Sequence, residues 1–215
     1  MSNSSTPREV TRRDFLSDLT VGAGGALALS AMLPSVARGD ESSHATSPVA
    51  EWDMSWVEKL TGKYRTVFDA PEIADGMVFT NARVFLDGFV EVYKASEADA
   101  QAVIVLRHNG VYLAFNDSIW AKYGLGADLK IPAGGKVNPW TREIATLKSR
   151  GATFIACNLA ATRRAGEIAR RLNLDRETVR ADIYANFVPG TIVMPSGVFA
   201  TVRAQQAGCS FMKSP

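Results

Sequence analysis

The sequence predicts an α/β domain with an open, mainly parallel five-stranded sheet and helices on both faces, a three-layer α/β/α arrangement. Two continuous apolar runs of strand length, residues 102–106 and 153–157, are typical of parallel strands that are covered on both faces. Stretches with apolar residues at helical spacing separate these runs along the chain. Because strands that alternate with helices are joined by right-handed crossovers, this order predicts a doubly wound sheet.

The first half of the domain supplies two of the expected strands. Residues 64–68 form a short β-rich run, and apolar residues at helical spacing between 82 and 93 predict a helix after it. The strand at 102–106 comes next and precedes a second helical pattern, from 115 to 123. Residues 124–138 are rich in Gly and Pro, so we expect a loop there.

The second half begins with a helix whose ends can be read from the sequence. Asn138 is expected to cap it, with Pro139 at its first position and Gly151 at its end. Further on, Ser196 is expected to cap the last helix and Gly208 to end it. The other elements alternate as before, with strands at 153–157, 191–194 and 210–212 and helices at 161–172, 176–184 and 198–206.

Residues 1–37 predict an export leader. The adjacent Arg12 and Arg13, followed by an aromatic residue and a leucine, are typical of a twin-arginine signal. The apolar run that follows is too weakly apolar for a stable membrane span, and Ser35 with Ala37 gives the small-x-small pattern of a cleavage site. We therefore expect a periplasmic protein that is exported after folding and meets the membrane only through this leader. An uncleaved anchor is the main alternative.

Residues 38–52 are polar and predict a flexible tether, followed by one domain over 53–215. Trp56 and Leu60 are expected to lie on a short amphipathic turn that docks onto this domain. The chain carries a formal net charge of +2, and the leader holds equal numbers of acidic and basic residues. Since no strongly basic stripe is visible, the composition argues against nucleic acid as a partner.

The polar residues with chemical potential gather where the strands end. Ligands of an open parallel sheet bind beyond the carboxyl ends of its strands. The residues at or just after those ends are Asp69, Arg107, His108, Asn109, Cys157, Asn158, Ser196 and Gly197.

Cys157 is the candidate catalytic residue. It lies at a strand-to-helix junction, where the N–H groups of the helix and its dipole can stabilise a thiolate. Arg163 and Arg164 follow within two turns and are expected to add positive potential. A buried structural cysteine is the alternative. A disulfide with Cys209 is disfavoured, because the two thiols are expected at opposite edges of the sheet and a disulfide needs Cα atoms within about 7 Å.

His108 has four readings: a base, a metal ligand, a polar wall of the pocket, or a hydrogen-bonded structural histidine. With no second histidine outside the predicted tether and no carboxylate at ligand spacing, the sequence predicts no metal site. Arg107 and Asn109 are candidates for binding an anion, and Asn158 and Ser196 are candidate pocket residues. No cofactor is expected, since the Gly-Gly-Lys at 134–136 lacks the other residues of a phosphate loop.

The segments 151–160, 188–198 and 203–208 resemble the DsrE/DsrF-like family of sulfur-relay proteins. The resemblance extends over nearly all of the domain, and its strongest motifs lie in the last third. It implies a five-stranded α/β domain that forms homo-oligomers, often trimers or hexamers, and a persulfide on a cysteine after the third strand, the position that Cys157 matches. The chain departs from the sulfur carriers in its export leader, its loop at 124–138, and Cys209, where relatives have an aromatic residue.

Two functions follow as expectations. In the first, the protein is a periplasmic sulfur carrier or sulfurtransferase, in which Cys157 accepts a sulfane sulfur and passes it to a thiol protein partner. Asn158 then positions the start of the helix, and His108 forms the pocket wall. In the second, the protein is a non-enzymatic oligomeric binding module in which Cys157 is structural. Redox or metal chemistry shared by His108 and Cys157 has only these two residues in its favour.

Overall fold

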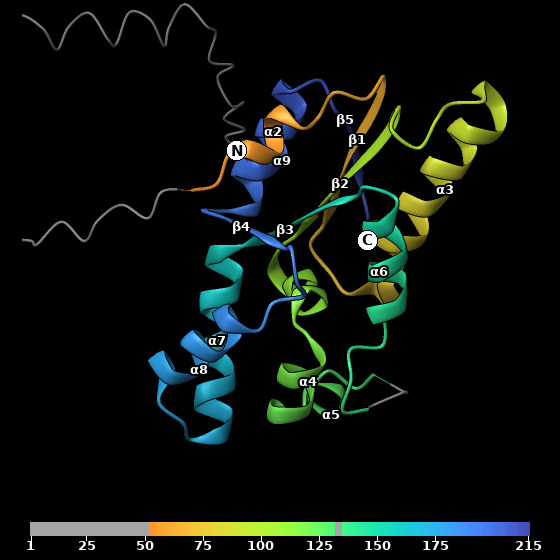
Figure 1. The fold of residues 1–215 in the computed structure, drawn as a ribbon. Coiled ribbons are helices and arrows are strands. Elements are labelled where there is room, and N and C mark those ends of the chain that lie inside the picture. Colours follow the sequence, from red (N-terminus) through yellow and green to blue (C-terminus); the bar gives the residue numbers. More distant parts are fainter. Residues whose placement is uncertain (1–51, 132–134) are drawn as a thin grey trace, which may run out of the picture. The chain divides into compact units, whose positions relative to one another are not determined.

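The computed structural model describes residues 52–131 and 135–215 and contains the expected three-layer α/β/α fold (Figure 1). The predicted leader, with Arg12 and Arg13, and the predicted tether up to residue 51 lie outside the described residues.

Five strands form one sheet in the order β4-β3-β2-β1-β5, and every pair of neighbours is parallel. The mainly parallel sheet predicted from the sequence is therefore confirmed, with β2 in the centre and β4 and β5 at the edges. The register pairs Val105 of β2 with Asp69 of β1 and with Ile155 of β3. The strands are β1 (Tyr64–Ala70), β2 (Ala100–Leu106), β3 (Thr153–Cys157), β4 (Ile192–Met194) and β5 (Ser210–Lys213).

Alternate side chains of the strands divide the core into two layers. Phe68, Ile104 and Phe154 belong to the larger layer, with α3, α4, α6, α7 and α8. Their neighbours Val67 and Ile155 point to the opposite face, which α2 and α9 cover. The helices are α2 (Ser55–Glu58), α3 (Met77–Tyr93), α4 (Asp117–Tyr123), α5 (Leu125–Asp128), α6 (Thr141–Ser149), α7 (Asn158–Leu172), α8 (Arg176–Ala185) and α9 (Gly197–Gln206), with short 3-10 helices η2 (Ala74–Gly76) and η3 (His108–Ala114).

The docking turn at the start of the domain is present as α2. Trp56 and Leu60 are buried in the smaller core layer, so this prediction is confirmed. No helix among the described residues is both long enough and apolar enough to cross a membrane.

The connection after β2 differs from the prediction. Residues 108–114 form η3, whose apolar side chains are buried, although no helix was expected there. The predicted loop at 124–138 was also partly wrong, because its first residues form α5 and bury Leu125. Periodicity over so few residues cannot separate a short helical turn from a loop.

Asn138 has a different role from the predicted cap. It is buried, and its Nδ2 donates to the carbonyl oxygens of Leu113 at 3.0 Å and Phe115 at 2.9 Å. Its Oδ1 accepts from the N–H of Trp140 at 3.0 Å, and α6 begins only at Thr141. The prediction of Pro139 as the first helical residue was therefore wrong, because Asn138 fastens this segment to η3 and α4 instead.

Three other helix ends lie where the sequence placed them. The Ser196 hydroxyl accepts from the N–H of Phe199 at 3.0 Å and caps α9. Gly151 follows α6 with φ of 81°, and Gly208 follows α9 with φ of 88°. Both glycines adopt the left-handed conformation that commonly ends a helix.

Candidate functional site

A cavity of about 180 Å³ opens at the carboxyl edge of the sheet, where β2, β3 and β4 end. Cys157, His108 and Ser196 all line it, so the predicted convergence of these three residues is confirmed. We call this space the thiol cavity. The cavity is also lined by Arg107, by residues of the first two turns of α7 and by the start of α9.

Cys157 is both the last residue of β3 and the N-cap of α7. Its Sγ accepts a hydrogen bond from the Ala160 N–H at a distance of 3.4 Å. The residue is 6% exposed, so the thiol is sheltered yet borders the cavity. This hydrogen bond places the sulfur at the N-terminus of α7, where its position in the sequence predicted it.

Arg107 is held in place by a carboxylate. Its Nε and Nη2 donate to the two carboxylate oxygens of the buried Asp69 at 2.5 Å and 2.7 Å. These hydrogen bonds raise the pKa of Arg107 above its usual value, although burial acts in the other direction. The planar fork of the guanidinium therefore faces Asp69, and the expectation that Arg107 uses it to bind an anion was wrong.

Gly197 leaves room for this arginine. A Cβ built on Gly197 would lie 2.7 Å from Cβ and 2.9 Å from Cδ of Arg107. The absence of a side chain lets the start of α9 approach Arg107 closely, which closes one side of the thiol cavity.

His108, the exposed first residue of η3, lines the cavity. Its φ of 45° lies in the left-handed region, which residues other than glycine rarely adopt. Its imidazole forms no hydrogen bond to any residue of the described ranges, so the reading as a hydrogen-bonded structural histidine gains no support. The arrangement fits a polar wall of the cavity.

Arg163 and Arg164 supply the positive potential expected near Cys157, and both line the cavity. The Nε of Arg163 lies 3.1 Å from Oε1 of Glu167, and Arg164 pairs with Oε2 of the same glutamate. The Arg164 guanidinium also lies 5.7 Å from the centre of the Tyr112 ring. Two cations thus share one carboxylate, which leaves a net positive charge beside the thiol.

The Glu167 pairing predicts a stability change in acid. Burial tends to raise the pKa of Glu167, but hydrogen bonds and charges from Arg163 and Arg164 outweigh it and lower the pKa below its ordinary value of 4.5. The pairing therefore stabilises the fold above pH 4.5, and this contribution is lost as the pH falls through the folded-state pKa. Between about pH 6 and about pH 3, the wild type should lose up to about 1 kcal/mol more unfolding free energy than Glu167→Gln. Urea titrations across this range measure the difference, and parallel losses in both proteins would contradict it.

Two predicted pocket residues do not line the thiol cavity. The Asn109 Nδ2 donates to Oε2 of Glu72 at 2.7 Å and ties η3 to the segment after β1. The Asn158 side chain accepts from the hydroxyl of Tyr184 on α8. This bond ties the first residue of α7 to α8, while Cys157 caps the helix.

Cys209 lies apart from the site. It precedes β5 at the amino end of the sheet, while Cys157 ends β3, so the predicted placement of the two thiols at opposite edges is confirmed. Both thiols are free. Burial raises the pKa of the Cys209 thiol, which makes it a slower nucleophile at neutral pH.

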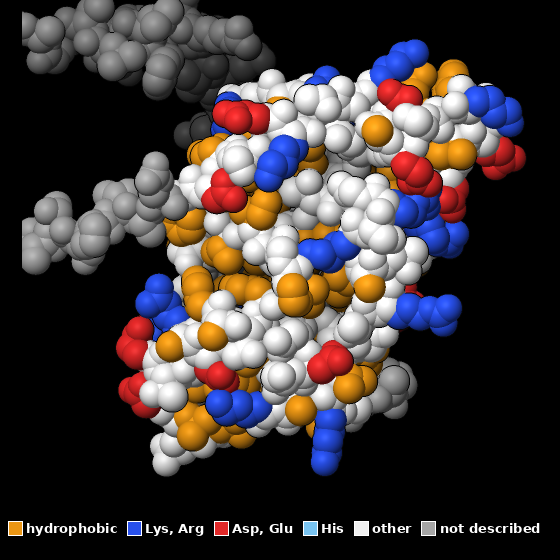
Figure 2. All heavy atoms as spheres, viewed as in Figure 1, with side chains coloured by type: hydrophobic (Ala, Val, Ile, Leu, Met, Phe, Trp, Pro, Cys, Tyr) orange, Lys and Arg blue, Asp and Glu red, His pale blue; other side chains and the backbone are white. Residues whose placement is uncertain are grey.

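The rim of the thiol cavity is apolar. Leu159 and Val198 line the cavity and are 65% and 63% exposed, and Phe199 and Val202 continue this surface along α9. Hydrophobic side chains also gather in a band across the middle of the face drawn in Figure 2, with charged groups above and below. A contiguous group of exposed apolar side chains is typical of a surface that contacts a partner.

Sequence reasoning missed a second, larger cavity beside the first. It has a volume of about 940 Å³ and is formed by α7 and α8. Arg163, Gly166 and Arg170 lie on one face of α7 at spacings of three and four residues, and this pattern could have revealed it. Among the described residues, no cluster of three or more potential metal ligands occurs.

Comparison with known proteins assigns neither a family nor a function to the chain. No family model matches the sequence, and no curated protein matches it. A solved structure from Methanobacterium thermoautotrophicum, of a protein of unknown function, is similar over 70% of this chain and 99% of its own. The sequence identity is 17% and the TM-score is 0.41.

Proposed function

We propose that this chain is a periplasmic protein of the DsrE/DsrF-like type that carries sulfur as a persulfide on Cys157. The observation that supports the proposal best is the position of Cys157, a sheltered thiol that caps α7 and borders a cavity lined by Arg163 and Arg164, two cations that share one carboxylate. An anionic thiolate and an anionic persulfide both fit this positive environment. A thiol protein partner would then take the sulfur.

The cavity suits a small sulfur species. Its volume of about 180 Å³ is below the range of typical drug-sized sites, so only the reacting end of a donor would enter. The apolar rim that includes Leu159 and Val198 offers a contact surface for the partner or for further copies of the chain. We propose a homo-oligomer, a trimer or a hexamer, on the basis of the resemblance described above.

Persulfide mass spectrometry tests the proposal. The reduced full chain is incubated with inorganic polysulfide, and the sulfur added to each cysteine is measured. We expect one added sulfur on Cys157 in the wild type and in Cys209→Ser, and none at this position in Cys157→Ser. The serine hydroxyl can still cap α7, so the variant should fold. Equal labelling of the wild type and Cys157→Ser would overturn the proposal.

The second candidate function is an oligomeric binding module in which Cys157 is structural. Its support is the depth of Cys157, which is 6% exposed, together with the exposed apolar surface on α9. It predicts that iodoacetamide at neutral pH alkylates Cys157 no faster than Cys209. Faster modification of Cys157 by tenfold or more, on the order expected for a thiolate, favours the sulfur carrier.

A further inference from the structure

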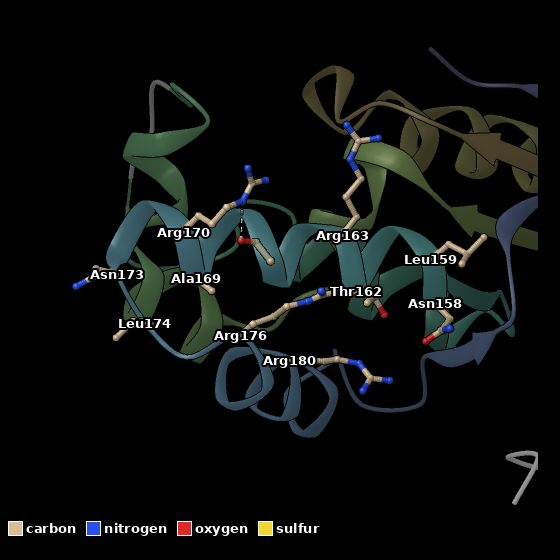
Figure 3. A pocket seen from close by; sticks show the side chains of 11 residues that line it. Asn158, Leu159, Thr162, Arg163, Ala169, Arg170, Asn173, Leu174, Arg176 and Arg180 are labelled. Atoms are coloured by element: carbon tan, nitrogen blue, oxygen red, sulfur yellow. Dashed lines mark hydrogen bonds between the residues drawn. The ribbon is translucent and has the colours of Figure 1, made fainter. Parts of the chain in front are cut away.

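The larger cavity lies over the exposed surface of α7 and α8 and has a volume of about 940 Å³, within the range of small-molecule sites (Figure 3). We call it the arginine hollow. It is lined along α7 from Asn158 to Asn173, and beyond that helix by Leu174, Arg176 and Arg180.

The arginine hollow is positively charged. Four arginines and no acidic residue line it. Two of them, Arg163 and Arg180, pair with glutamates of their own helices. Within the part of the chain that the structure describes, Arg170 and Arg176 lie beyond ion-pair distance of every carboxylate. The hollow therefore has positive charge available for an anionic ligand.

Because Gly166 has no side chain, Arg176 lies against the surface of α7 at this position, close to Arg170. The Arg170 Nε donates to the Gly166 carbonyl oxygen at 3.3 Å, and the Arg176 Nε would lie 3.6 Å from a Cβ built on Gly166. In Figure 3, Arg176 lies along the side of α7 that faces α8, while Arg170 projects from the other side. A ligand in the hollow could thus meet the two cations on different sides of α7, which suits a molecule with two separated negative groups.

The arginine hollow borders the thiol cavity. Leu159 and Arg163 line both spaces. From Leu159 to Gly166, an α-helix rises about 10 Å, which is close to the length of an extended tripeptide, about 10 Å. A molecule of this size can place its negative groups at Gly166 and its other end at the mouth of the thiol cavity.

We infer that the arginine hollow binds a low-molecular-weight thiol with at least two negative groups, whose persulfide is the sulfur donor of Cys157. This inference rests on the proposed function. The Cys157 thiolate attacks the terminal sulfur of the donor persulfide, and a new S–S bond forms as the donor's S–S bond breaks. The inner sulfur of the donor leaves with the electron pair as a thiolate, and the proton stays on the transferred sulfur. The exchange requires no external oxidant or reductant.

The experiment compares two donors on the full chain. Glutathione persulfide carries two carboxylates, and the persulfide of glutathione dimethyl ester has the same length without them. Sulfur added to Cys157 is followed over time by mass spectrometry in the wild type and in Arg170→Gln/Arg176→Gln. Arg83→Gln/Arg142→Gln is the control, because it removes two exposed arginines from α3 and α6, outside the hollow. Inorganic polysulfide serves as a sulfur donor that is expected to react with Cys157 without binding in the arginine hollow.

We expect the double substitution in the hollow to slow transfer from glutathione persulfide at least tenfold. Transfer from polysulfide should stay within twofold, and the control variant should match the wild type with both donors. Equal rates with glutathione persulfide and its dimethyl ester, or no effect of Arg170→Gln/Arg176→Gln, would overturn the inference and leave the proposed function in place. If no donor labels Cys157, the proposed function and this role as donor site both fail. Calorimetric titration with glutathione then tells whether the hollow still binds the anion.

Discussion

Replacement of Gly110 by alanine should destabilise the protein by about 3 kcal/mol or more, because the new methyl group meets backbone that cannot move aside. A Cβ at Gly110 would lie 2.2 Å from the carbonyl oxygen of Ala70. That oxygen already accepts from the N–H of Arg107 at 3.1 Å, and the Gly110 N–H donates to Pro71 at 3.0 Å. The contact therefore holds η3 against the end of β1, directly beside the thiol cavity.

The same substitution at Gly88 provides the control. Gly88 lies within α3, and a Cβ there meets nothing within 4 Å. Gly88→Ala should stabilise the protein by about 0.5–1 kcal/mol, since alanine favours a helix more than glycine does. Unfolding in guanidinium chloride, monitored by circular dichroism, gives both free energies. Gly110→Ala with a free energy within 1 kcal/mol of the wild type, on the order of an ordinary substitution, would show that the approach of η3 to β1 is looser than described.

Substitution of Asp69 by alanine should cost about 3 kcal/mol of unfolding free energy. Asp69 is buried and accepts both hydrogen bonds of Arg107, so its loss leaves a partly buried guanidinium without its partner. Asp69→Asn should cost less, because the amide oxygen still accepts one of the two hydrogen bonds. We also expect slower persulfide formation on Cys157 in Asp69→Ala, since Arg107 lines the same cavity.

The exposed pair formed by Arg180 and Glu177 is the matched comparison for this ion pair. Its Arg180 Nη1 lies 3.3 Å from the Glu177 carboxylate, and both side chains are open to solvent. Glu177→Ala should change the unfolding free energy by less than about 0.5 kcal/mol. Comparing the unfolding free energies of Asp69→Ala and Glu177→Ala separates the effect of burying an ion pair from the effect of the pairing itself. A similar small effect in both variants would mean that Arg107 regains water as easily as Arg180 does.

The regular part of the fold could be predicted from the sequence because its signals are local. The strand at 153–157 was placed with its observed bounds, since a buried parallel strand reads as a continuous apolar run. The end of α6 at Gly151 and the cap of α9 at Ser196 depend on residue types with specific backbone or hydrogen-bonding roles.

The irregular part could not be predicted in the same way. Asn138 lies next to a proline, as a helix cap often does, but its amide bonds two carbonyls of a distant segment. Such a contact depends on where η3 comes to lie, and nothing near Asn138 in the sequence records this. Residues 108–114 were not predicted as a helix for another reason: this 3-10 helix is too short to give a periodic pattern of apolar residues.

The candidate site shows a similar division. The topological rule for open sheets brought Cys157, His108 and Ser196 to one edge, and the structure places them around one cavity. The rule does not tell which way a side chain turns, so Asn109 and Asn158 were assigned to a cavity that they do not line. The ion pair between Asp69 and Arg107 was not predicted, because the two residues lie 38 positions apart and meet only where β1 pairs with β2.

The sheet position of β5, next to β1, determines which contacts of β1 form only after the last strand has been synthesised. β5 pairs with β1, and beyond it the N–H of Ser214 donates to the carbonyl oxygen of Asp69 at 2.8 Å. The Ser214 hydroxyl also accepts from Asn81 at 2.7 Å. During synthesis, Asp69 leaves the ribosome long before Ser214 does. The backbone hydrogen bond between Ser214 and Asp69, the residue that holds Arg107, therefore forms only after Ser214 has emerged. A chain in which β5 has not yet formed therefore holds Asp69, the partner of Arg107, without this backbone hydrogen bond.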